Sequence, residues 1–191
     1  ALSAASCRGY AAPEVERTYR RARELCQHLG NTTDLFPVMR GLCTFYIVRD
    51  EQTIARELAE QCLRLAQESQ RVDYRMEGHT ALGYTLGYLG EFEASLKQLE
   101  QCLTLYEAQR GKPLTPLTPQ DSGVACLAFS AFVLWLLGYP DRALQRCQDA
   151  LTLAEQLEQP FNLAYAHVYK ATCHQWRREP QEAASHSRIA I

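Results

Sequence analysis

The sequence predicts an all-α fold, an α-solenoid of antiparallel helix hairpins that repeat about every 40 residues. The clearest hairpin lies between residues 120 and 156. Residues 122–137 are apolar on nearly every side and carry no charge, which is typical of a helix covered by neighbours. After a break at 138–141, apolar residues recur every three or four positions, which indicates an amphipathic second helix. Because one hairpin cannot bury both faces alone, the pattern predicts an array.

Short similar segments of sequence, called phrases below, recur along the chain and indicate the repeat length. LTLAE at 151–155 matches LTLYE at 103–107, LRLAQ at 63–67 and RELCQ at 23–27. The offsets between successive phrases are 48, 40 and 40 residues. The longer offset coincides with an insertion at 111–119, GKPLTPLTP, whose three prolines and one glycine cannot continue a helix.

Nine helices are expected, at residues 13–29, 33–48, 51–70, 73–89, 91–109, 121–137, 140–159, 160–177 and 180–191. Prolines stand at the expected starts of the first, seventh, eighth and ninth, where a missing N–H is harmless. Gly30 and Asn31 end the first helix, and Thr33 or Asp34 can cap the second.

We expect residues 1–191 to form one repeat domain. The first and last helices have no hairpin partner, and neither end shows the polar cap that repeat arrays need. The chain is therefore expected to be a piece of a longer protein. Ordinary fraying of a complete domain is the alternative.

Composition excludes several classes of function. The net charge of -2 argues against a broad contact with nucleic acid or anionic lipid. No apolar run reaches the roughly 18 residues of a membrane span, so we expect a soluble, cytoplasmic chain. The eight cysteines contain no C-x-x-C pair and are expected to be reduced and buried.

The sequence also lacks the marks of catalysis. There is no G-x-x-x-x-G-K-[ST] phosphate loop, and His167, Cys173 and His174 fall short of the three or four convergent ligands of a zinc site. We therefore expect no catalytic residue, no metal and no cofactor, and do not interpret the chain as an enzyme.

Small residues recur twelve positions apart, one in each helix of a hairpin, where they let two backbones approach closely. The pairs are Cys43 and Ala55, Gly83 and Ser95, Ala131 and Ala143, and Ala171 and Ala183. In this pattern the chain resembles tetratricopeptide repeats. A spacing of 40 exceeds the 34 residues usual for that family, and its aromatic positions hold other residues, namely His79, Leu86, Leu127 and Leu134.

Several longer phrases resemble the repeat region of large bacterial signalling proteins. In those proteins a class III adenylate/guanylate cyclase or protein kinase domain precedes an AAA-like STAND ATPase module and a helical tail. The phrases are FPVMRGL at 36–42, ALGYTLGYLGEF at 81–92, GVACL at 123–127 and WLLGYP at 135–140. The resemblance implies a sensor or scaffold tail without catalysis of its own.

In tetratricopeptide arrays the first helix of each hairpin lines a concave groove. Carrying those positions over implies a set of partner-binding side chains: Arg40, Thr44, Glu77, Thr80, Tyr84, Tyr88, Phe132, Trp135, Tyr165, Gln175 and Trp176. The expected partner is a protein or peptide segment, or neighbouring domains of the same chain. The alternative for the aromatic residues is that they only pack between helices.

Two functions stay open. The first is a non-enzymatic scaffold for protein or interdomain contacts. The second is a domain that senses a small-molecule effector, as in STAND-type regulators. An open aromatic groove favours the first, and an enclosed pocket with convergent polar groups favours the second.

Overall fold

The computed structural model describes residues 11–28, 32–111 and 117–190, which form helices joined by turns and bends. The helices of these residues are α2 (Pro13–His28), α3 (Thr32–Val48), α4 (Gln52–Ser69), α5 (Val72–Tyr88), α6 (Phe92–Ala108), α7 (Ser122–Leu136), α8 (Pro140–Leu157), α9 (Pro160–Trp176) and α10 (Pro180–Ile189). The expected helices are confirmed, with ends that shift by a few residues. The expectation that the last helix lacks a hairpin partner is wrong, because α10 packs on α9. Because α3 begins at Thr32, Thr33 and Asp34 lie within its first turn and not before it.

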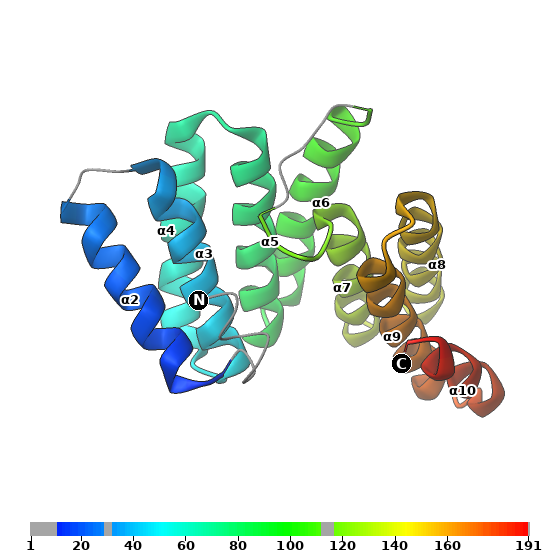
Figure 1. Cartoon of the computed structure of the whole chain (residues 1–191). Coiled ribbons are helices and arrows are strands. Elements are labelled where there is room, and N and C mark those ends of the chain that lie inside the picture. Colours follow the sequence, from blue (N-terminus) through cyan, green and yellow to red (C-terminus); the bar gives the residue numbers. More distant parts are fainter. Residues whose placement is uncertain (1–10, 29–31, 112–116, 191) are drawn as a thin grey trace.

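The helices follow one another in a single array from α2 to α10 (Figure 1). Each helix packs on the next, and α3, α5, α7 and α9 also pack on one another in succession. Within the described residues, α4, α6 and α8 contact only their neighbours in the chain. The first helices of the hairpins therefore form a continuous inner layer, and the second helices form an outer layer. This arrangement confirms the α-solenoid.

Four hairpin turns share one backbone conformation. Each has a residue with positive φ, at Asp50, Gly90, Gly138 and Arg178, with φ between 60° and 85°. The N–H of the following residue donates to the carbonyl five positions back, as from Tyr139 to Leu134 at 2.9 Å. This is the Schellman ending of a helix. Its intervals of 40, 48 and 40 residues match the offsets between the sequence phrases.

The small residues lie where paired helices cross. Ala55, Ser95 and Ala143 are fully buried. The hydroxyl of Ser95 donates to the carbonyl of Gly83 at 2.6 Å. A Cβ atom on Gly83 would stand 2.8 Å from the side chain of Leu99, closer than packed carbon atoms allow. Close approach of the backbones therefore requires the small residues at this crossing.

Some expectations concern residues outside the described part, namely the Gly30–Asn31 helix stop, Cys7, and 112–116 of the insertion. The seven cysteines within the described residues are free thiols, and six of them are buried. Among the described helices, none combines the length and the apolar character that a membrane crossing requires.

Candidate functional site

Aromatic side chains of the inner layer form a continuous row across α5, α7 and α9. The ring centroids of Tyr84 and Phe129 are 4.2 Å apart, and those of Phe129 and Phe132 are 5.2 Å apart. Phe132 contacts Trp176 at 6.0 Å, and Trp176 contacts Trp135 at 5.3 Å. We call these five rings, together with Tyr88, Tyr165 and Tyr169, which also contact the row, the aromatic row.

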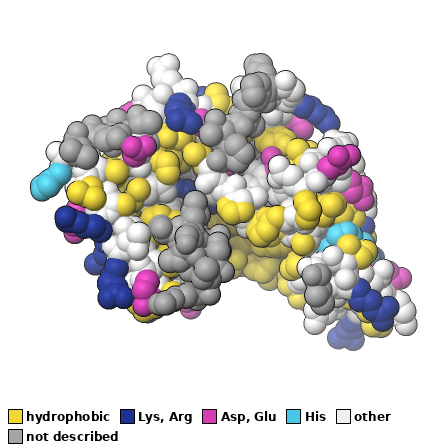
Figure 2. Space-filling view, viewed as in Figure 1, with side chains coloured by type: hydrophobic (Ala, Val, Ile, Leu, Met, Phe, Trp, Pro, Cys, Tyr) yellow, Lys and Arg dark blue, Asp and Glu magenta, His cyan; other side chains and the backbone are white. Residues whose placement is uncertain are grey.

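One side of the aromatic row reaches the surface. The side chain of Tyr88 is 48% exposed, and Phe132, Trp135 and Trp176 are partly exposed. Between α7 and α9 lies an apolar crevice of about 150 Å³, lined by Ala131, Phe132, Val168, Tyr169, Thr172, Cys173 and Trp176. Figure 2 shows hydrophobic side chains gathered on the face where the surface recedes between the two halves of the array. The row therefore offers both exposed rings and a recess the size of one apolar side chain.

The deeper part of the aromatic row is held by hydrogen bonds. The hydroxyl of Tyr84 donates to the carbonyl of Ala125 at 3.0 Å and lies 2.8 Å from the hydroxyl of Tyr165. Tyr165 in turn donates to Tyr169 at 3.3 Å. Burial raises the pKa of Tyr165 to about 12 and the pKa of Tyr84 well above its ordinary value, so both phenols are neutral. These tyrosines tie α5 to α7 and α9.

At the other end of the inner layer, two of the residues assigned to the groove form a buried ion pair. The guanidinium Nε of Arg40 donates to Glu77 at 3.0 Å, and both side chains are under one-tenth exposed. Arg40 also donates to the hydroxyl of Thr44, and Ser122 donates to Glu77 at 2.7 Å. The pair therefore joins α3, α5 and the start of α7 beneath the surface.

Thr80 is also buried, and its hydroxyl donates to the carbonyl of Met76 at 2.8 Å. Gln175 is exposed near the end of α9. Phe129 and Tyr169 are not among the residues predicted from the sequence to line the groove. They stand three residues before Phe132 and four after Tyr165. Helical spacing places such residues on one face, and this signal could have found them.

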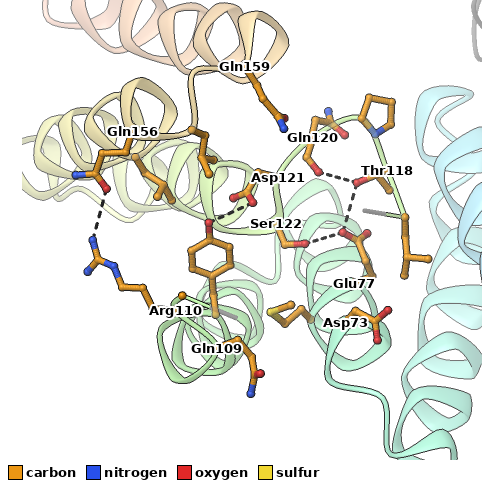
Figure 3. A pocket seen from close by; sticks show the side chains of 17 residues that line it. Asp73, Glu77, Gln109, Arg110, Thr118, Gln120, Asp121, Ser122, Gln156 and Gln159 are labelled. Atoms are coloured by element: carbon orange, nitrogen blue, oxygen red, sulfur yellow. Dashed lines mark hydrogen bonds between the residues drawn. The ribbon is translucent and has the colours of Figure 1, made fainter. Parts of the chain in front are cut away.

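A second site is a cleft of about 370 Å³ among helix ends (Figure 3). It lies between the start of α5, the end of α6, the start of α7 and the end of α8. Its polar side chains are Asp73, Glu77, Tyr106, Gln109, Arg110, Thr118, Gln120, Asp121, Ser122, Gln156 and Gln159. Its apolar side chains are Met76, Leu117, Pro119, Leu153 and Leu157. We call this site the helix-end cleft.

Asp121 is one of three carboxylates that line the helix-end cleft. One of its oxygens accepts from the backbone N–H groups of Gly123 at 2.9 Å and Val124 at 3.1 Å, so Asp121 caps α7. The other oxygen accepts from the hydroxyl of Tyr106 at 3.2 Å. Burial raises the pKa of Asp121 above its ordinary value, although all three hydrogen bonds favour the charged form.

No protein-family model and no curated protein sequence matches the chain. Among solved structures, it is similar to BtubC (BKLC) from P. vanneervenii, with a TM-score of 0.67 and 18% identity over 93% of this chain and 69% of that one. A putative kinesin light chain from Podosopora anserina with nearly identical TPR-like repeats gives a TM-score of 0.63 and 16% identity, over 92% of this chain and 86% of that one. MamA gives 0.56 and 12%, over 98% and 90%.

The architecture and these likenesses together define the fold. The chain is a TPR-like repeat domain, an α-solenoid of hairpins longer than the usual tetratricopeptide.

Proposed function

We propose that the chain is a non-enzymatic scaffold that binds a segment of another protein, or a neighbouring domain of its own chain, on the inner layer. The observation that supports this function is the aromatic row with its exposed rings and apolar crevice. Aromatic rings supply a large contact area at low entropic cost and dominate the energetics of protein interfaces. We infer that Tyr88, Phe132, Trp135 and Trp176 contact the partner directly.

The other residues assigned to the groove have supporting roles in this proposal. Tyr84 and Tyr165 hold the exposed rings in place from below. Arg40 and Glu77 join α3 to α5. The hydroxyl of Thr80 lies against the thiols of Cys102 in α6 and Cys126 in α7, while Thr44 and Gln175 border the surface. The phrases that resemble the repeat region of bacterial cyclase or kinase and STAND ATPase proteins support a place in a cytoplasmic signalling protein of that kind.

The test is selection of peptides from a phage-displayed library on the purified chain, followed by affinity measurements with one selected peptide. We expect Tyr88→Ala and Trp176→Ala each to weaken binding by at least about tenfold, since central interface rings commonly contribute more than 1.4 kcal/mol. Phe161→Ala is the matched control, because Phe161 is 50% exposed and makes no ring contact with the aromatic row. Equal losses of affinity in all three variants, or a loss in Phe161→Ala alone, would exclude the inner layer as the peptide-binding surface.

The helix-end cleft favours a second candidate function, the sensing of a small-molecule effector. Its volume of about 370 Å³ lies in the range of small-molecule sites, and polar groups from four helix ends converge in it. A thermal-shift screen of metabolites tests this function independently of peptide binding. A compound that raises the melting temperature supports it, and a screen without any such compound contradicts it.

A further inference from the structure

We propose that the helix-end cleft binds a small aliphatic amine, with its ammonium group at Asp121 and its methylene groups against the apolar wall formed by Met76 and Leu153. This proposal rests on the second candidate function and specifies the chemical class of the effector. It is carried by the shape of the cleft, by the balance of charge in its lining, and by the side chains that have hydrogen-bonding capacity left.

The charges in the lining of the helix-end cleft are not fully paired among the described residues. Three carboxylates line the helix-end cleft, but two of them already have cations of their own. Glu77 pairs with Arg40, and Asp73 pairs with Arg71. Asp121 forms no ion pair with any residue in the described part of the chain. A carboxylate that is largely removed from water and lacks a cation is a favourable place for an ammonium group.

The lining of the helix-end cleft disfavours an anionic ligand. Helix N-termini attract anions because their first N–H groups lack partners. At the start of α7, however, Asp121 itself occupies the N–H groups of Gly123 and Val124. The Arg110 side chain lies at the rim, is 66% exposed and is paired with Glu107. An incoming carboxylate or phosphate would meet the charge of Asp121, and the lining among the described residues offers no unpaired cation to compensate it.

The apolar part of the lining suits the uncharged part of the ligand. Met76, Leu117, Leu153 and Leu157 present a wall without hydrogen-bonding groups, which suits methylene groups better than a hydrated inorganic cation. No group of three or more His, Cys, Asp or Glu side chains among the described residues could hold a metal ion. These features favour an organic amine over a metal.

Two amide side chains of the lining have hydrogen-bonding capacity left. The side chains of Gln109 and Gln120 line the cleft and form no hydrogen bond with other described residues. Figure 3 shows Gln120 on the side of the cleft nearest Thr118 and Asp121. Each amide has a donor and an acceptor for a second polar group of the ligand. A diamine of short chain length therefore fits the lining better than a monoamine.

The experiment is isothermal titration calorimetry of the purified chain with putrescine (1,4-diaminobutane). The matched compounds are 1,4-butanediol, which keeps the shape without charge, and succinate, which reverses the charge. We expect putrescine to bind and both controls to fail. Equal binding of the diol, or no putrescine binding up to millimolar concentrations, would overturn the proposal.

The variant that isolates the charge is Asp121→Asn, because asparagine caps helices as well as aspartate does. We expect at least tenfold weaker putrescine binding with an unchanged melting temperature. Asp141→Asn is the control, since it removes a carboxylate from the first turn of α8 that is 93% exposed. Unchanged affinity in Asp121→Asn would contradict the assignment.

A second variant keeps the test decisive if Asp121→Asn does not fold. Gln120→Arg places a cation in the lining at a partly exposed position, and we expect it to abolish putrescine binding. Full binding in Gln120→Arg would also overturn the proposal. If a compound of another class stabilises the chain in the metabolite screen while putrescine does not bind, effector sensing survives and only the amine assignment fails.

Discussion

The inner layer of the array is held together by different chemistry in its two halves. Between α3 and α5 the contact contains the buried ion pair of Arg40 and Glu77. From α5 to α9 the same layer is joined by the aromatic row. Both halves nevertheless have the same hairpin turn and the same small residues at the helix crossings. The turns and the small residues at the crossings are common to both halves and determine the fold. The side chains between the inner helices differ from one half to the other without changing it.

The largest effect is expected in the ion-paired half. Glu77→Gln leaves the buried guanidinium of Arg40 without its counter-charge, and removing one partner of such a pair typically costs about 3 to 5 kcal/mol. Urea denaturation gives the free energy of unfolding. The double variant Arg40→Met with Glu77→Leu should recover most of the loss, because no charge is left buried. A single variant as stable as the wild-type chain would show that the pair does not hold this half together.

In the aromatic half, removing the rings of two tyrosines on neighbouring turns of α5 should destabilise the chain to different extents. Tyr84→Ala removes a partly buried ring packed on Phe129 and should cost about 3 to 5 kcal/mol, the range for large aromatics in cores. Tyr88→Ala removes a ring that is 48% exposed and should cost less than about 1 kcal/mol. Denaturation of the two variants separates structural rings from rings available to a partner. Equal costs would remove this distinction.

The feature shared by both halves can be tested at a helix crossing. Ala143 is fully buried, so Ala143→Phe should destabilise the chain by about 1 to 3 kcal/mol through overpacking. Ala94→Phe is the control, because Ala94 is exposed on the corresponding helix of the preceding hairpin. If the two variants melt alike, the small residues do not set the helix spacing.

A smaller effect is expected at the α9–α10 contact, which uses histidines. The Nδ1 atoms of His167 and His186 are 2.8 Å apart, so one ring donates to the other. The pKa of His186 is lowered to about 4 by burial first and then by Lys170, His167 and His174, and burial also lowers the pKa of His167. Glu155 opposes the shift at His167.

Because the folded chain disfavours charged His186, the unfolded chain binds more protons as the pH falls from about 6.5 to about 4. The contribution to stability is complete above that window and is lost as the pH falls through it. Thermal melts across this range should show a decline that is shallower in His186→Gln. Glu179, whose pKa is lowered by its hydrogen bond to His174, adds a decline of the same sign at lower pH. Identical slopes in both chains would contradict the assignment to His186.

The repeat pattern was sufficient to predict the fold, because matching phrases and turn residues recur at fixed offsets. It also placed Tyr88, Phe132 and Trp176 on one layer. Helical periodicity gives the direction of a side chain but not its depth, so it could not show that Arg40 and Glu77 lie below the surface. Their pairing joins two residues that are 37 positions apart in the chain and lie on different helices. The helix-end cleft was not predicted, since it exists only where the ends of four helices meet.

The four Schellman turns differ in the residue that adopts positive φ. The free-energy cost of the turn therefore differs between the centre of the array and its two outer hairpins. The two central turns use Gly90 and Gly138, which adopt that conformation without steric cost. The two outer turns use Asp50 and Arg178, and a residue with a Cβ atom pays about 1 kcal/mol there. Because each hairpin in the described part of the chain packs only on the hairpins next to it, such a cost lowers the stability of its own hairpin more than that of distant ones. We therefore expect amide hydrogens of the outer hairpins to exchange with solvent before those of α5 to α8, so that the chain opens from its ends and keeps a stable centre.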